Sequence, residues 1–134
     1  MARYAARKGA IYLGTAAAGV ATNLTAMAEW SLDGTTDKID VTSFGDANMV
    51  RLQGLPDRKG TFAGFWDDTE TKLFAAAASA GAVNMYLYPD VTDKPTSYFY
   101  GPAWVDFSMN ASVKDAVKVT GNFVAGGSWG SNGV

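Results

Sequence analysis

The sequence has no cysteine and no histidine among its 134 residues. The chain therefore lacks disulfides, thiolate nucleophiles, Ser-His-Asp and Cys-His relays, and the usual zinc ligands. Most enzyme hypotheses are weakened, and we expect a protein that is not an enzyme and uses no cofactor and no metal. Gly9–Gly14, which follows the basic residues near the start, is too short for a signal peptide or a membrane span. We expect no contact with a membrane, and synthesis in a cytoplasm.

The sequence contains few charged residues of either sign, 18% in all. Eleven Lys and Arg stand against thirteen Asp and Glu, a net charge of -2, so no strong overall field would hold the molecule on nucleic acid or an anionic membrane. The charges are unevenly spread, because Arg3, Arg7 and Lys8 precede every acidic residue, whereas residues 29–46 are predominantly acidic. The simplest interpretation is a basic end followed by a solvated acidic hairpin.

Apolar residues make up 48% of the chain, enough for one packed core. We expect a single domain over residues 1–134, with a flexible N-terminal arm (residues 1–9) and a Gly-rich C-terminal tail (residues 126–134). The tail carries Trp129, a large aromatic residue in a linker-like context. This side chain either docks on a neighbouring molecule or folds back on its own domain.

Alternation of apolar and polar residues is the dominant pattern, and it predicts strands. Residues 22–32 alternate, residues 33–36 have turn composition, and residues 37–44 alternate again, which predicts a hairpin over Thr22–Phe44. Turn clusters surround a short apolar piece in Ser43–Pro56, so we expect a long projecting loop there. Lys59–Trp66 returns to a strand pattern, with glycines that permit a bulge or a close approach.

The sequence predicts one helix, at about residues 68–80. Asp67 or Asp68 is a candidate N-terminal cap, Leu73 and Phe74 belong to an apolar stripe, and Gly81 is suited to end the helix in a left-handed conformation. Capping also explains the adjacent carboxylates better than general acid–base chemistry does.

Strand patterns resume over residues 83–87, and a second hairpin is predicted over Ala103–Phe123. The expected fold is mainly β: an antiparallel barrel or sandwich of about seven strands with one flanking helix. Its edge strands need protection or a partner chain. For four tyrosines, at positions 86, 88, 98 and 100, we expect packing in the core or at an interface rather than stacking on a ligand.

Four segments carry a family resemblance when taken in order. They are Glu29–Asp33 (EWSLD), Asp37–Asp46 (DKIDVTSFGD), Gly54–Asp57 (GLPD) and Gly60–Asp67 (GTFAGFWD). This succession resembles the tail tube proteins of long-tailed bacteriophages, over roughly Ala10 to Asp68. The resemblance implies a small barrel or sandwich whose copies close into rings of six, with inner strands joined around a channel for viral DNA. It also implies partners among the other tail proteins and a location in the virion tail.

The resemblance also suggests where this chain makes its contacts. The two predicted hairpins are candidates for the channel lining, with Glu29, Asp33 and Asp40 as acidic groups that let DNA pass without specific binding. Lys114 and Lys118 complicate that hypothesis if they also face inward. The loop is the candidate contact between stacked rings, because it concentrates four apolar residues in an otherwise exposed segment: Met49, Val50, Leu52 and Leu55.

Two other interpretations stay open at this point. A capsid decoration or head-tail connector protein also combines a small β-domain with Gly-rich arms. A carbohydrate-binding sandwich would use exposed Trp or Tyr, although the lack of an export signal argues against it.

Overall fold

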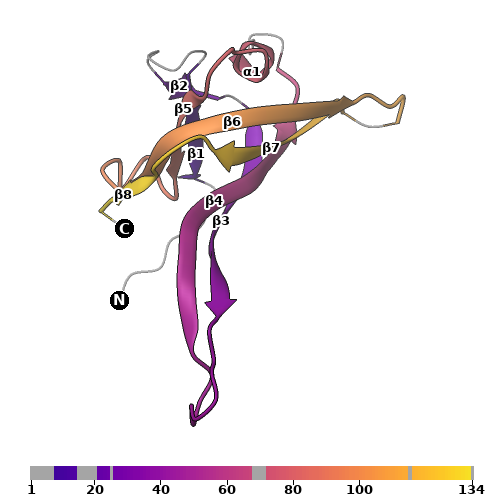
Figure 1. Cartoon of the computed structure of the whole chain (residues 1–134). Helices are drawn as coiled ribbons and strands as arrows, with labels where there is room; N and C mark the ends of the chain where they lie inside the picture. Colours follow the sequence, from indigo (N-terminus) through magenta and orange to yellow (C-terminus); the bar gives the residue numbers. More distant parts are fainter. Residues whose placement is uncertain (1–7, 15–20, 25, 68–71, 115, 134) are drawn as a thin grey trace.

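The chain folds as one antiparallel sheet of eight strands with a short helix beside it (Figure 1), which confirms the mainly β prediction. A computed structural model describes residues 8–14, 21–24, 26–67, 72–114 and 116–133. The elements are β1 (Ala10–Leu13), β2 (Thr22–Asn23), β3 (Met27–Asp40), β4 (Arg51–Phe65), α1 (Lys72–Ala77), β5 (Val83–Tyr88), β6 (Tyr98–Asn110), β7 (Lys118–Ala125) and β8 (Gly130–Asn132).

The strands are ordered β2-β1-β5-β6-β7-β4-β3, and β8 pairs with the first part of β6. Inward-facing residues of β1, β4, β5, β6 and β7 meet in one hydrophobic cluster, so the two halves of the sheet pack over a common core. The predicted alternation in β5 is confirmed, because Val83, Met85 and Leu87 are fully buried and the residues between them are not. Removing this much apolar surface from water is the main stabilising term of such a fold.

The predicted hairpin over Thr22–Phe44 is wrong. Its supposed turn, residues 33–36, lies in the middle of β3, which pairs with β4 over almost its whole length. Gly34 has no positive φ, and it is extended beneath the Arg58 side chain, 3.3 Å from where a Cβ would lie. The chain reverses later, between Val41 and Val50, where Gly45 adopts a φ of 92°. Residues 33–36 have the composition of a turn but form none, because they pair with β4 like the rest of β3.

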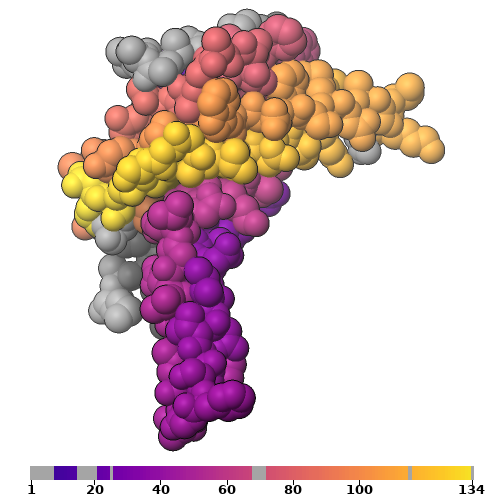
Figure 2. Space-filling view, in the orientation of Figure 1, coloured from indigo at the N-terminus to yellow at the C-terminus, as the bar shows by residue number. Residues whose placement is uncertain are grey.

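The far part of the β3–β4 hairpin projects from the body as an arm (Figures 1 and 2). Strand β4 pairs with β7 only from Lys59 onward, so residues 34–58, which we call the arm, pair only with each other. The projection expected for Ser43–Pro56 is present. Its last part, Arg51–Pro56, is strand rather than loop.

The helix ends earlier than predicted, at Ala77 rather than at residue 80, and its described part spans Lys72–Ala77. Asp68 lies outside the described residues, and Asp67 precedes the described start of the helix, so the predicted cap stays a prediction. Gly81 lies beyond the helix end and has no positive φ, so it is not the left-handed terminator. Two residues of the helix, Leu73 and Ala76, are buried and pack on the core, and they fix the position of the helix beside the sheet.

The described residues nearest the two chain ends contact the rest of the domain in different ways. Residues 1–7 of the predicted N-terminal arm lie outside the described residues, and Lys8 forms an ion pair with Asp93, N to O distance 2.8 Å. The Gly-rich tail contributes β8 and returns Trp129 onto its own domain, where the indole N–H donates to the Pro102 carbonyl at 2.6 Å.

Candidate functional site

The part of the sheet with the order β6-β7-β4-β3 has one buried and one exposed face. Burial alternates along β7 and along β6 from Gly101 to Ser108, and neighbouring strands are in register, so outward side chains form rows across four strands. We call this outward surface the polar face. Its members are Glu29, Ser31, Asp33, Thr35, Asp57, Lys59, Thr61, Ala63, Phe65, Trp104, Asp106, Ser108, Asn110, Lys118, Thr120, Asn122 and Val124.

Carboxylates outnumber ammonium groups on the polar face. Four acidic side chains stand against two basic ones, and the register places Asp33 directly opposite Lys59. Hydroxyl and amide groups fill the rows between them; the Ser31 and Thr61 hydroxyl oxygens lie 2.9 Å apart. The face also holds an open hollow of about 370 Å³, lined in part by Glu29 and Asp106. The surface is hydrophilic and weakly negative.

Only part of the predicted acidic set shares this face. Glu29 and Asp33 lie on it, two rows apart. Asp40 lies at the end of the arm, and by strand alternation it points to the opposite side of β3. Its carboxylate accepts the backbone N–H of Thr42 at 2.9 Å, and hydrogen bonds from the Thr42 hydroxyl and N–H hold the Asp40 pKa below its usual 3.8. Asp40 therefore shapes the arm's turn.

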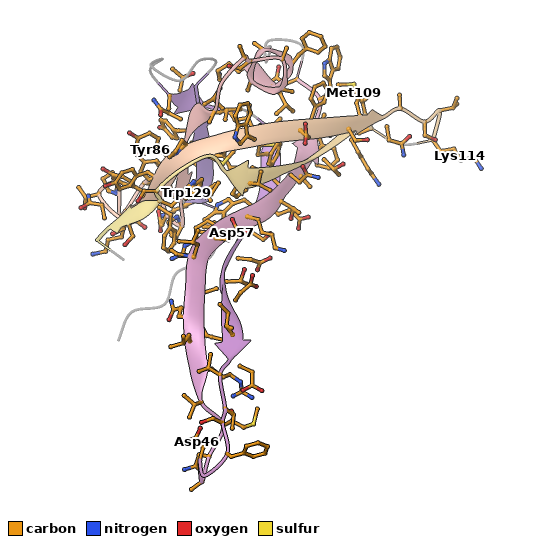
Figure 3. The ribbon with its side chains drawn as sticks, viewed as in Figure 1. Asp46, Asp57, Tyr86, Met109, Lys114 and Trp129 are labelled. Carbon is orange, nitrogen blue, oxygen red and sulfur yellow. The ribbon has the colours of Figure 1, made fainter. Side chains whose placement is uncertain are left out.

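Asp57 and Asp106 belong to the polar face, and the sequence analysis did not identify them. Asp106 stood within a predicted alternating strand, but its neighbours across the sheet were unknown. Asp57 follows the turn-like residues that end at Pro56, and it pairs with Thr35 inside β4. The predicted second hairpin is confirmed as β6–β7. Lys118 is on the polar face, whereas Lys114 lies at the tip of that hairpin, far from the arm (Figure 3).

The four-stranded part ends in two free edges within the described chain. Strand β3 has a partner only on its β4 side. Strand β6 pairs with β5 and β8 up to Ala103, so from Trp104 to Asn110 its only partner is β7. Unpaired backbone N–H and C=O groups along such edges are templates for another strand.

The arm carries a second candidate surface. Cross-strand pairing places four exposed apolar side chains on one side of it, which we call the arm stripe: Ile39, Val41, Val50 and Leu52. Val50 and Leu52 were predicted as contact residues, and the structure adds Ile39 and Val41. Met49 alternates to the other side, and Leu55 lies nearer the body, at an irregularity in the β3–β4 register. None of the arm's residues joins the core.

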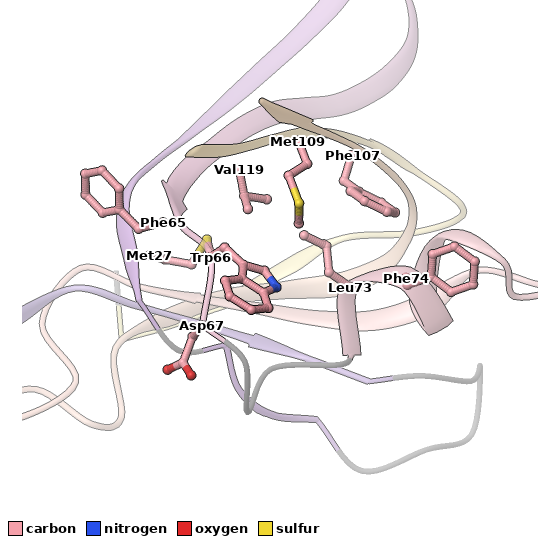
Figure 4. A pocket seen from close by; sticks show the side chains of 9 residues that line it. All are labelled: Met27, Phe65, Trp66, Asp67, Leu73, Phe74, Phe107, Met109 and Val119. Atoms are coloured by element: carbon pink, nitrogen blue, oxygen red, sulfur yellow. The ribbon is translucent and has the colours of Figure 1, made fainter. Parts of the chain in front are cut away.

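A third surface is an apolar pocket beside the helix (Figure 4). Its volume is about 450 Å³, and among the described residues that line it Asp67 is the one that carries a charge. Leu73 and Val119 are buried, whereas Trp66 and Phe74 keep 52% and 72% of their surface exposed. The other lining residues are Met27, Phe65, Phe107 and Met109. We call this the helix pocket.

The predicted tyrosines lie together on the outward side of β5 and β6, joined by Tyr12. Ring centroids of neighbouring pairs are 5.0–5.8 Å apart, so these rings pack mainly on one another. Burial, reinforced by the neighbouring tyrosines, raises the pKa of Tyr88. The cluster therefore covers the outward side of β5 and the first part of β6.

No group of three acidic side chains in the described ranges is placed to hold a metal ion. No helix among those residues has the length and apolar character needed to cross a membrane.

Comparison with known proteins identifies the fold. No protein-family model and no curated protein sequence matches the chain. A chain from the tail of an empty gene transfer agent particle, refined helically with C6 symmetry, matches with a TM-score of 0.76 and 13% identity, over 97% of this chain and 99% of that one. A chain of the native gene transfer agent virion matches with a TM-score of 0.79, 13% identity and the same coverage.

The SPP1 tail tube is also similar, with a TM-score of 0.74 and 12% identity, over 95% of this chain and 77% of that one. The resemblance to tail tube proteins is therefore confirmed at the level of the fold. At such low identity the likeness is one of architecture, and function has to be argued from the surfaces of this chain.

Proposed function

We propose that this protein is the tail tube subunit of a bacteriophage-type particle. Six copies would close into a ring, rings would stack into a tube, and DNA would pass through the channel without specific binding. The protein would be made and assembled in the host cytoplasm and remain in the virion tail with other tail proteins. The observation that carries the proposal is a four-stranded sheet with a polar outer face between two free edges.

The free edges are compatible with ring closure. Adjacent strands in the order β6-β7-β4-β3 are antiparallel, so β3 runs opposite to β6. Rotation about a ring axis preserves strand direction along that axis, so β3 of one copy would meet β6 of the next in antiparallel orientation. An even number of strands per copy thus permits one continuous antiparallel barrel with no remaining edge.

The size of such a barrel suits a DNA channel. Four strands from each of six copies, spaced about 4.8 Å apart and tilted by about 40°, give a backbone diameter of roughly 45–50 Å. Side chains of the polar face would line this space. The channel that remains is water-filled and wider than duplex DNA.

The charge of the polar face supports passage rather than binding. Proteins that hold DNA neutralise phosphates with Lys and Arg. Here Glu29, Asp33, Asp57 and Asp106 outnumber Lys59 and Lys118, so the wall would weakly repel the phosphates. Hydroxyl and amide groups between the charges would keep the wall hydrated.

Electron microscopy of the purified protein tests the proposal. We expect long hollow tubes, and a cryo-EM map with β3 beside β6 of the next copy and the polar face toward the channel. A strictly monomeric protein at high concentration would overturn the proposed function. Isolated rings or trimers would favour a connector or a capsid decoration protein. Tubes with the polar face outward would refute the assignment of the lining.

A further inference from the structure

The arm is a projecting two-stranded hairpin with exposed apolar side chains, which are features of a surface that binds a partner. An isolated two-stranded hairpin is marginally stable in water, yet residues 34–58 extend beyond the rest of the sheet. The arm stripe is 40–56% exposed, and the Phe44 ring at the tip is fully exposed. Exposed apolar groups concentrated on a projection are typical of a contact surface.

The tip is nevertheless a defined structure. Asp46 accepts hydrogen bonds from the Ser43 backbone N–H at 2.8 Å and from its hydroxyl at 3.2 Å. The Val50 N–H donates to the Thr42 hydroxyl oxygen at 2.9 Å. These bonds hold Phe44 and the arm stripe in place before any partner is met, which lowers the entropic cost of docking.

The helix pocket offers the matching surface. Eight of the nine described residues that line it are apolar. A cavity of about 150 Å³ is enough for a benzene-sized group, so about 450 Å³ can take two or three large apolar side chains. Phe74 and Phe107 meet edge to face on one side, with ring centroids 6.2 Å apart, and provide a firm wall.

The arm and the pocket of one molecule cannot meet. Figure 3 places Asp46, at the arm tip, and Met109, which lines the pocket, at distant ends of the molecule. The arm strands are paired with each other to the tip and point away from α1 (Figure 1). A contact between the two surfaces therefore joins two copies head to tail, and a heterologous contact of this kind propagates without closing.

We infer that the arm tip of one copy docks in the helix pocket of a second copy, in the next ring. Val41, Phe44 and Val50 enter the pocket, and Trp66 and Phe74 close over them. The inference rests on the proposed function, since it identifies which surface receives the arm when rings stack. The pocket is thereby the element that sets the spacing and rotation between rings.

Site-directed cross-linking tests this contact, because the natural chain has no cysteine. Asn48 at the tip and Ala75 on α1 are both exposed, and replacing them with Cys leaves the arm stripe, Phe44 and the pocket lining unchanged. A short bis-maleimide added to tubes of the double variant should give a ladder of covalent oligomers. Mixed tubes of the two single variants should give dimers that contain one copy of each.

The matched control pairs Ala75→Cys with Val113→Cys, which lies fully exposed beside the tip of the other hairpin. That pair should give no ladder. Tubes that form normally while Asn48→Cys fails to cross-link to Ala75→Cys would overturn the pocket assignment and leave the proposed function intact. If the unmodified protein forms no tubes, the proposed function itself fails.

A second variant tests the energetics of docking. Phe74→Asp should abolish tube elongation while the subunit stays folded, because Phe74 is largely exposed in the free subunit. Val113→Asp, at a fully exposed apolar residue away from the pocket, should leave elongation unchanged. Normal tubes from Phe74→Asp would also overturn the inference.

Discussion

The indole ring of Trp129 stacks on the phenyl ring of Phe123, with centroids 5.7 Å apart and planes within 10° of parallel. Phe123 is buried in β7, and Trp129 precedes β8, so this contact fastens the C-terminal tail to the core. The indole also covers Gly101, where an added Cβ would lie 2.5 Å from the ring. The tail is thus part of the domain.

Trp129→Ala should destabilise the free subunit by about 2–4 kcal/mol. The value lies toward the lower part of the range for aromatic-to-alanine changes because Trp129 is only partly buried. Urea unfolding followed by circular dichroism measures it. Trp104→Ala, on the exposed face of β6, is the control and should cost less than about 1 kcal/mol. Equal losses would mean that the tail does not depend on the stacking contact.

Gly60→Ala should prevent correct pairing of β3 with β4. A Cβ at Gly60 would lie 2.0 Å from the Ser31 carbonyl oxygen, which is backbone and cannot move without breaking the ladder. We expect little soluble folded protein. Gly54→Ala, in the arm, is the matched control, since its Cβ would be 3.4 Å from Asp37. Thermal unfolding of the two variants compares them, and similar melting temperatures would contradict the prediction.

Reversing two charges on the polar face should make the tube bind DNA. Glu29→Lys with Asp33→Lys leaves two carboxylates and four ammonium groups on that face, so phosphate binding with release of counterions becomes favourable. DNA retention in assembled tubes, measured at several salt concentrations, should rise and fall off steeply with salt.

The control for that experiment adds lysines elsewhere. Thr92→Lys with Thr96→Lys places two positive charges on exposed residues of the loop before β6. Its tubes should retain no more DNA inside the channel than the unmodified protein, which nuclease protection can test. Protection by the loop variant alone would show that the polar face is not the lining.

Shortening the arm should separate folding from stacking. Replacing residues 39–52 by Asn-Gly joins Lys38 to Gln53, which face each other in the register, through a two-residue turn. The core loses no residue, so we expect a folded subunit that forms no long tubes. Circular dichroism and electron microscopy test the two expectations, and tubes of normal length would show that the arm is dispensable.

The turn at the arm tip should weaken in acid. Hydrogen bonds from Thr42 hold the pKa of Asp40 below 3.8, so the ionised carboxylate stabilises the turn above that pH. This contribution is lost as pH falls through the lowered pKa. NMR titration of the Asp40 carboxyl group should show the low value, and Thr42→Val should move it back toward 3.8. An unchanged pKa in the variant would contradict the proposed cause.

The alternating patterns predicted most of the strands correctly, because the two faces of an amphipathic strand can be read from the alternation of apolar and polar residues in its own sequence. Strands β5, β6 and β7 lie where Val83–Leu87 and Ala103–Phe123 indicated. The first hairpin was misplaced because Asp33–Thr36 has turn composition, and only pairing with β4 shows that it is extended. The helix was overextended because alanine propensity runs past Ala77, where packing on the core ends.

For the candidate surfaces too, some residues could be placed from the sequence and others could not. Glu29 and Asp33 could be placed on one face by counting, because they stand an even number of residues apart in one strand. Asp57 and Asp106 could not be added, since they join that face only through the register of four strands. The helix pocket draws on β3, β4, α1, β6 and β7, and no local pattern brings these elements together.

By itself, the sequence determined that the protein is a mainly β domain without thiol or imidazole chemistry, because composition and period-two alternation are local properties. Tertiary structure alone decided which residues share the polar face, where the free edges lie, and that the arm and the helix pocket point to distant ends of the molecule. Those properties depend on strand order and register, which arise from contacts between residues far apart in the chain.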